Sequence, residues 1–170
     1  MLQIAPQGRA PQPDLDRRGT RGPRSRAPLI DLVVDASVAF KWLVPDSAED
    51  DVPEAKALLV EHMEGRAKII IPPLLYYEVG NILLFGRSRP PIEQAVDALT
   101  DLFSIPLEVV PPALVSANAT LRLASLRGLS YYDATYVALA EMLDCPLITA
   151  DRRLAQRARA TGHVRLLGNG

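Results

Sequence analysis

The sequence predicts an α/β fold built around a mostly parallel sheet. From residue 29 onward, short apolar runs rich in β-branched residues alternate with longer segments whose apolar residues recur every three or four positions. The short runs are apolar on both faces, as are the strands of a parallel sheet that helices cover on both sides. With 170 residues, 48% of them apolar, the chain can form one well-buried core and is too short for two full domains.

Five short runs are predicted strands. The first, LIDLVVD at 29–35, ends in an aspartate, and the second, AKIII at 67–71, is followed by two prolines. Because the runs are short and bounded by turn-forming residues, we interpret them as strands and not as buried helices. The three later runs are LEVV, PLIT and VRLL, at 107–110, 146–149 and 164–167.

Helical spacing fills the intervals between these strands. A short helical segment is expected directly after residue 35. Proline stands at or near the first turn of several longer helices, where its missing N–H costs no hydrogen bond. The predicted longer helices span residues 54–64, 73–85, 92–103, 113–127, 132–143 and 152–160.

The near-neutral net charge of −1 is the sum of two unlike parts. Residues 1–28 contain six arginines and two aspartates, so this leader carries +4 while the remainder carries −5. The leader is poor in apolar residues and contains five prolines and three glycines. Such a segment cannot bury enough surface to offset its chain entropy, so we expect a disordered basic leader before one domain at 29–170. A solvated leader is favoured over the alternative, a basic arm that contacts RNA.

Several classes of protein are disfavoured by what the sequence lacks. No apolar run is long enough to span a membrane, and the first thirty residues lack the apolar region of a secretory signal. The one cysteine, Cys145, cannot form an internal disulfide, which agrees with a cytoplasmic protein. The glycine patterns of nucleotide-binding loops and the G-x-S-x-G motif of serine hydrolases are also absent. Acidic residues are therefore the candidates for carrying chemistry.

Two aspartates follow predicted strands, at the expected carboxyl edge of the sheet. Asp35 ends the first strand, in VVDASV, and Asp151 follows the fourth, in LITADRRL. In parallel α/β sheets ligands bind outside the carboxyl ends of the strands, so both positions suit a site. Each aspartate also precedes a helix, so a structural role as a helix N-cap is an equally open interpretation.

Two further acids lie on predicted helices. Glu78, in YYEVGN, falls on the apolar stripe of its helix, where a charge needs a partner, so a functional role is favoured. Asp133, in GLSYYDATYVALA, lies three residues after Ser130 and matches a capping box. A capping role and a role in a site account equally well for Asp133.

The four acids are more informative together than singly. Two charges about 4 Å apart repel by about 4 kcal/mol at an effective dielectric of roughly 20, so clustered carboxylates either raise their pKa values or bind a cation. Oxygen ligands without histidine or cysteine favour Mg²⁺ or Mn²⁺ over zinc. Ser37 and Thr149 could add hydroxyl contacts to such a site.

These motifs, in this order, resemble the PIN-domain ribonucleases, and within them the VapC toxins of bacterial VapBC toxin–antitoxin modules. The resemblance runs from about Leu32 to Leu167 and is carried by VVDASV, YYEVGN, GLSYYDATYVALA and LITADRRL. It implies a three-layer α/β/α sandwich with a central, mostly parallel sheet. It also implies a set of site residues: the catalytic, metal-binding acids Asp35, Glu78, Asp133 and Asp151, with Ser37 and Thr149 in support.

The activity that the resemblance implies is hydrolysis of RNA phosphodiester bonds. The protein would be a Mg²⁺- or Mn²⁺-dependent endoribonuclease and the toxin of a type II module. A VapB-like antitoxin would hold it inactive. Members of this family are commonly homodimers, so a homodimer is expected. A net charge of −5 outside the leader is low for an RNA-binding protein. Local positive charge comes from Arg87, Arg89, Arg152, Arg153, Arg157 and Arg159.

Other functions are compatible with parts of the sequence. A PIN nuclease that processes RNA without an antitoxin is one alternative, and a catalytically silent module that binds RNA or protein is another. The silent module is disfavoured because all four acids are present. A phosphotransferase with an aspartyl nucleophile at Asp35 is disfavoured because the sequence Asp-Ala-Ser lacks a second aspartate.

Overall fold

The computed structural model describes residues 30–45, 49–87 and 89–168, so the predicted leader at 1–28 lies outside the described residues. Its centre is a five-stranded sheet in the order β3-β2-β1-β4-β5, with every neighbouring pair parallel. The predicted parallel sheet is confirmed, and each strand lies inside its predicted run. The strands are β1 (Ile30–Val34), β2 (Ala67–Ile71), β3 (Glu108–Val109), β4 (Leu147–Thr149) and β5 (Val164–Leu166).

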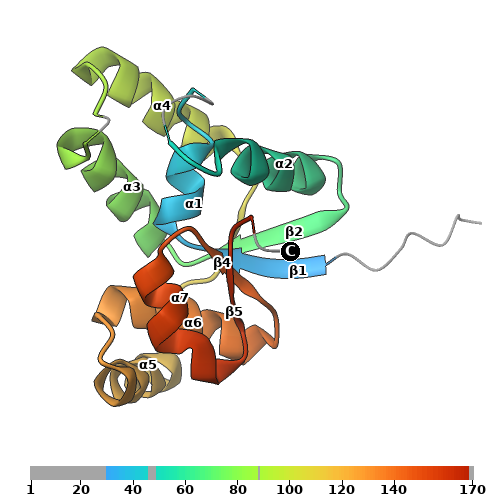
Figure 1. Ribbon diagram of the computed structural model, residues 1–170, viewed down its shortest axis with the longest axis vertical. Coiled ribbons are helices and arrows are strands. Elements are labelled where there is room, and N and C mark those ends of the chain that lie inside the picture. The colour runs from blue at the N-terminus through green and yellow to red at the C-terminus, as the bar shows by residue number, and fades with distance from the viewer. Residues whose placement is uncertain (1–29, 46–48, 88, 169–170) are drawn as a thin grey trace, which may run out of the picture.

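Helices lie on both sides of the sheet and complete the expected three layers (Figure 1). Helices α1 to α4 lie on one side, whereas α6 and α7 lie on the other, with α5 packed against the outer face of α6. None of the helices in the described ranges is long and apolar enough to cross a membrane. The helices are α1 (Ala36–Lys41), α2 (Val52–Met63), α3 (Leu74–Phe85), α4 (Ile92–Ser104), α5 (Leu114–Arg127), α6 (Tyr131–Leu143) and α7 (Arg152–Ala158), and the 3-10 turn η1 (Arg159–Thr161) follows α7.

Two boundaries of the longer helices differ from the predicted ones by two residues, for local reasons, and the others differ by at most one residue. Helix α2 begins at Val52, two residues early, directly after Asp51 in the left-handed backbone region (φ 59°), and a proline fits its first turn. Helix α7 ends at Ala158 instead of residue 160, because the chain tightens into η1. Gly162, with φ 79°, then turns it toward β5.

The core holds β1 at the middle of the sheet. Val33 and Val34 are completely buried, and Val33 is in register with Ile70 of β2 on one side and Leu147 of β4 on the other. Because these side chains pack against helices on both sides of the sheet, the position at which β1 ends is fixed. The next residue, Asp35, is therefore held at a defined place at the carboxyl edge.

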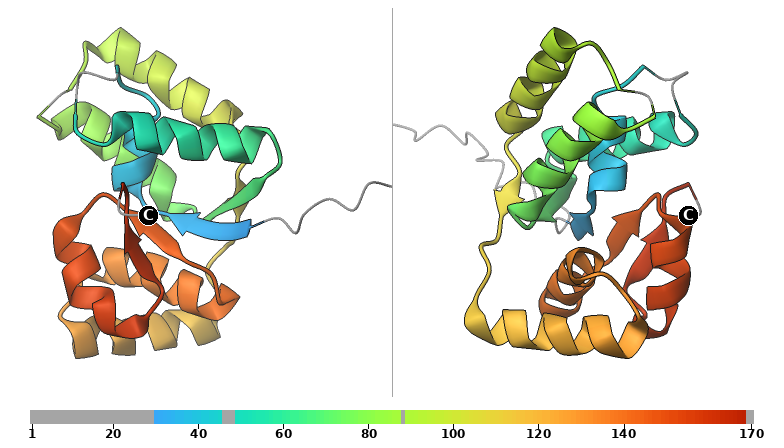
Figure 2. Two further views of the ribbon diagram at one scale, coloured as in Figure 1. Left: turned by 45° about the vertical axis from the view of Figure 1, so that its right-hand side comes forward. Right: turned by 90° about the vertical axis from the view of Figure 1, so that its left-hand side faces the viewer.

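The carboxyl ends of β1 and β4 form the switch point of the sheet. The two strands are neighbours, yet the chain continues from β1 into α1 on one side and from β4 into α7 on the other (Figures 1 and 2). In parallel sheets ligands bind where the connections diverge in this way. The fold places Asp35, directly after β1, and Asp151, directly before α7, at this edge.

Candidate active site

Asp35 lies at the centre of the site and is almost completely buried, with 5% of its surface exposed. It is the N-cap of α1, and its Oδ1 accepts the backbone N–H of Val38 at 3.2 Å. The same oxygen accepts the Ser37 hydroxyl at 2.6 Å, and Oδ2 accepts the Thr149 hydroxyl at 2.5 Å. The capping role considered from the sequence is therefore correct, but it uses only part of the carboxylate.

Ser37 and Thr149 connect the carboxyl ends of β1 and β4. Ser37 Oγ accepts the backbone N–H of Ala150 at 2.9 Å, and Thr149 Oγ1 accepts that of Asp151 at 2.9 Å. Each hydroxyl gives its proton to Asp35 and accepts a backbone N–H from the segment after β4. The two side chains thus hold Asp35 in place relative to the start of α7.

Asp151 is exposed and is the N-cap of α7. Its Oδ1 accepts the backbone N–H groups of Arg153 at 2.7 Å and Leu154 at 3.2 Å. The capping interpretation is again correct for one carboxylate oxygen. Its Oδ2 accepts no hydrogen bond from the residues that the structure describes.

Glu78, on α3, finds its partner on the opposite side of the sheet. The hydroxyl of Tyr136, on α6, donates a short hydrogen bond to Glu78 Oε2. Tyr136 is 2% exposed and was not identified from the sequence. One signal could have identified it: Tyr136 lies three residues after Asp133, on the same face of the helix.

Asp133 lies in the first turn of α6, where Ser130 is the N-cap. The Ser130 hydroxyl accepts the backbone N–H of Asp133 at 2.9 Å, so the cap uses the main chain of Asp133. Its carboxylate makes no hydrogen bond or ion pair within the described ranges. Capping therefore does not account for the acid, which lines a cleft of about 160 Å³ together with Asp151.

The four acids form one electrostatically linked set. Burial raises the pKa of Asp35 above its ordinary value, its three hydrogen bonds oppose that rise, and the charge of Asp151 adds to it. Burial likewise raises the pKa of Glu78, the hydrogen bond from Tyr136 opposes the rise, and the charges of Asp35 and Asp133 add to it. The charges of Asp151 and Asp133 thus lie close enough to affect the protonation of Asp35 and Glu78.

No cationic side chain in the described part of the molecule pairs with these acids. The ion pairs there join Lys41 with Glu49, Arg66 with Glu61 and Glu64, Lys68 with Glu108, and His163 with Asp144. No three His, Cys, Asp or Glu side chains of the described residues lie close enough together to hold a metal ion in their present positions. The oxygen atoms that could serve as metal ligands nevertheless all belong to carboxylates and hydroxyls, which are the ligands that Mg²⁺ and Mn²⁺ prefer.

Two arginines line the same cleft as Asp133 and Asp151. The guanidinium of Arg157 donates to the backbone carbonyl of Gly128 at 2.8 Å. The guanidinium of Arg153 makes no hydrogen bond or ion pair with the residues that the structure describes. Exposed positive charge therefore lies directly beside the acids.

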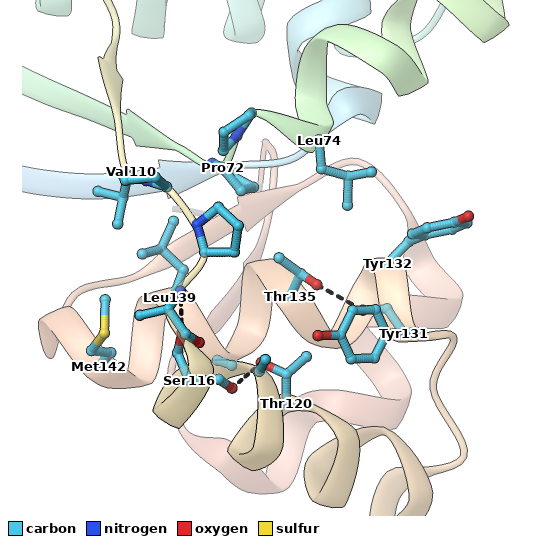
Figure 3. Close-up of a pocket in the computed structure, with 16 residues that line it drawn as sticks. Pro72, Leu74, Val110, Ser116, Thr120, Tyr131, Tyr132, Thr135, Leu139 and Met142 are labelled. Atoms are coloured by element: carbon cyan, nitrogen blue, oxygen red, sulfur yellow. Dashed lines mark hydrogen bonds between the residues drawn. The ribbon is translucent and has the colours of Figure 1, made fainter.

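A separate apolar pocket of about 340 Å³ lies between the start of α3, the segment after β3, and helices α5 and α6 (Figure 3). No charged residue lines it. The hydroxyls of Ser116, Thr120 and Thr135 donate to backbone carbonyls within their own helical turns, so they are already satisfied. None of the four acids lies in this pocket, whose chemistry suits apolar side chains.

A family model and two similar proteins assign this chain to the same family. Residues 32–160 match the PIN domain family. The chain is 33% identical to Ribonuclease VapC3 of Pyrobaculum aerophilum over 130 residues, which cover 74% of this chain and 93% of that protein. It is 36% identical to Ribonuclease VapC1 of Mycobacterium tuberculosis over 129 residues, which cover 74% and 89% of the two chains.

Solved structures share the fold. The crystal structure of VapC20 from Mycobacterium tuberculosis, described as a toxin that cleaves the sarcin-ricin loop, is 17% identical with a TM-score of 0.59, covering 80% of this chain and 98% of that one. VapBC2 from Rickettsia felis, solved with a DNA fragment from its promoter, is 13% identical with a TM-score of 0.55, covering 81% and 97%. With the family match and the two ribonuclease relatives, the fold leads to one conclusion: the chain belongs to the PIN domain family and, within it, to the VapC ribonucleases.

Proposed function

We propose that this protein is a Mg²⁺- or Mn²⁺-dependent endoribonuclease, the toxin of a type II toxin–antitoxin module, which hydrolyses RNA phosphodiester bonds. One observation carries the proposal: four carboxylates form one electrostatically linked set that includes Asp35 and Asp151 at the switch point, and no cationic side chain of the described residues neutralises them. Charge arranged in this way suits a hard divalent cation. The names of the two ribonuclease relatives support the same activity.

The four acids have two kinds of role in the proposed site. Asp35 and Asp151 are the principal ligands: three donors occupy Asp35 and leave about one acceptor position free, and Asp151 keeps Oδ2 free. Glu78 and Asp133 are further ligands or orient water. A bound cation would polarise the scissile phosphate and lower the pKa of its bound water, so that cleavage leaves a 5′-phosphate and a 3′-hydroxyl.

The chain's own residues prepare the site for this chemistry. Ser37 and Thr149 orient the Asp35 carboxylate, and their protons stabilise its charge without neutralising it. Arg153, exposed beside Asp133 and Asp151, would contact an RNA phosphate next to the scissile one. A shared cation requires the acids to draw closer than they lie here.

We extend the proposal to protein partners. The name VapBC2 of one structural neighbour supports an antitoxin partner for this chain. A short upstream reading frame that encodes a small DNA-binding protein would support the toxin, and its absence would favour a PIN nuclease that acts alone. A homodimer is proposed as well, with the apolar pocket at the subunit contact, because an uncharged face can meet its own copy without like-charge repulsion.

Loss of one proposed ligand should abolish cleavage without unfolding the protein. We expect Asp35→Asn and Asp133→Asn each to reduce the rate of RNA cleavage by more than about 100-fold, because losing a ligand exceeds the 10–100-fold cost of losing an outer contact. Cleavage of a labelled RNA with Mg²⁺ or Mn²⁺ is the measurement, and a thermal melt verifies folding. Asp101→Asn, at an exposed acid on α4, is the matched control. Undiminished RNA cleavage by either variant, or cleavage in the presence of a chelator, would contradict the proposed site.

Stability should depend on pH through the buried acids. The pKa values of Asp35 and Glu78 are raised in the folded state above the ordinary 3.8 and 4.5. The folded protein therefore holds protons that the unfolded chain has released, and stability falls as pH rises through this window. Each such proton contributes a slope of about 1.4 kcal/mol per pH unit. Urea unfolding in EDTA from pH 4 upward, at about one-unit steps, should show a flatter profile for Asp35→Asn than for the wild type. Added Mg²⁺ should restore stability to the wild type at neutral pH, and equal slopes in both proteins would contradict the expectation.

Arg153 should contribute to RNA binding through charge alone. In the non-cutting Asp35→Asn background, Arg153→Ala should weaken binding of single-stranded RNA and reduce the slope of log affinity against log salt by about 0.7. Fluorescence anisotropy across a salt series measures both quantities. Arg152→Ala removes an exposed charge from the adjacent position, which does not line the cleft, and is the control. Equal losses of RNA affinity in the two variants would show that the position of Arg153 in the cleft makes no particular contribution to RNA binding.

The apolar pocket should decide the oligomeric state. Ala138→Arg places a charge in the pocket and should convert a homodimer into a monomer, read as a halving of the mass by light scattering. Leu126→Arg, at a 76% exposed position on α5 outside the pocket, should leave the dimer intact. A monomeric wild type, or a dimer that survives Ala138→Arg, would refute this placement.

A further inference from the structure

Tyr136 is a buried polar side chain whose hydroxyl makes one hydrogen bond within the described residues. It lies on α6, within the apolar core, and its hydroxyl reaches the carboxylate of Glu78 on α3. The two residues are 58 positions apart in sequence and come from helices on opposite sides of the sheet. One hydrogen bond therefore joins the helix that carries Glu78 to the helix that carries Asp133.

Glu78 depends on this bond more than Asp35 depends on any of its own. Three donors hold Asp35: two hydroxyls and a backbone N–H. Among the described residues, Tyr136 is the single hydrogen-bond donor to Glu78, and no cation pairs with it. Without the phenol, the side-chain torsions of Glu78 would be restrained by packing alone.

We infer that Tyr136 is a positioning residue, which holds the Glu78 carboxylate toward Asp35 and Asp133 and thereby sets the affinity of the site for a divalent cation. This inference rests on the proposed function and deepens it. Tyr136 is too deeply buried to contact RNA, so its effect passes through Glu78. Groups that orient metal ligands typically change metal affinity by about 10–100-fold when they are removed.

The chemistry of the donor suits this role. A phenol hydroxyl stabilises the carboxylate by hydrogen bonding and leaves its full negative charge available. A lysine or arginine in the same place would neutralise Glu78 and compete with the cation. Burial, and then the nearby charge of Glu78, raise the pKa of the phenol far above its ordinary range, so it remains a proton donor at neutral pH.

Mn²⁺ binding to the cation-stripped full chain tests the inference directly. Titration calorimetry should show Mn²⁺ binding to Tyr136→Phe about tenfold or more weaker than to the wild type. Tyr132→Phe removes a hydroxyl from a 59% exposed tyrosine of the same helix and should leave Mn²⁺ affinity unchanged. Urea unfolding of each variant confirms that the titrated protein is folded. In RNA cleavage at saturating Mn²⁺, KM should stay constant because Tyr136 does not reach the substrate.

A double-variant cycle separates positioning from a general structural role. If Tyr136 acts through Glu78, then Tyr136→Phe added to Glu78→Gln should cause no further loss of Mn²⁺ affinity. A full additional loss in that background, or unchanged or tighter Mn²⁺ binding by Tyr136→Phe alone, would overturn the inference. A wild type that binds no Mn²⁺ and cuts no RNA would instead refute the proposed function, so the two failures are distinguishable.

Discussion

The structure depends on one buried carboxylate at the point where two neighbouring parallel strands end. A carboxylate as buried as Asp35 would take up a proton or destabilise the fold by several kcal/mol if it had no donors. Its donors Ser37 and Thr149 come from the two sides of the switch point, so Asp35 can lie there only while β1 and β4 are paired. The same pairing buries Val33 and Leu147 in the core. The pairing of β1 with β4 therefore both packs the core and holds the Asp35 carboxylate at the edge of the sheet.

Neutral donors, not cations, support the acids, and this choice has consequences for stability. Hydroxyls from Ser37, Thr149 and Tyr136 satisfy hydrogen-bonding capacity but leave the negative charges in place. Burial raises the pKa values of Asp35 and Glu78, and the charges of the neighbouring acids add to that rise, so the cation-free fold is less stable at neutral pH than it would be with paired acids. Functional sites commonly retain such an unfavourable arrangement, because a ligand that binds only the folded protein offsets it.

Local patterns in the sequence predict the elements of this fold better than they predict its contacts. Apolar runs and helical spacing locate all five strands. The inner strands β2, β1 and β4 are largely buried, as a covered parallel sheet demands, whereas both residues of the edge strand β3 are exposed, so the expectation of strands that are apolar on both faces is wrong there. The misplaced charge of Glu78 on an apolar stripe correctly indicates a partner. Tyr136 is not predicted as that partner because a tyrosine in an apolar helix is equally well explained as core packing. The pairing joins residues 58 positions apart and follows only from the strand order.

Capping and the proposed site role cannot be separated from the sequence because two of the acids are helix caps as well as proposed ligands. Asp35 and Asp151 each use an oxygen to cap a helix, so truncation to alanine would remove a cap as well as a proposed ligand. Asparagine keeps the capping oxygen and removes the charge, so it isolates the ligand role. At Asp133 the cap belongs to Ser130, and the carboxylate has no structural partner among the described residues. Asp133 is therefore the acid whose presence the fold alone explains least.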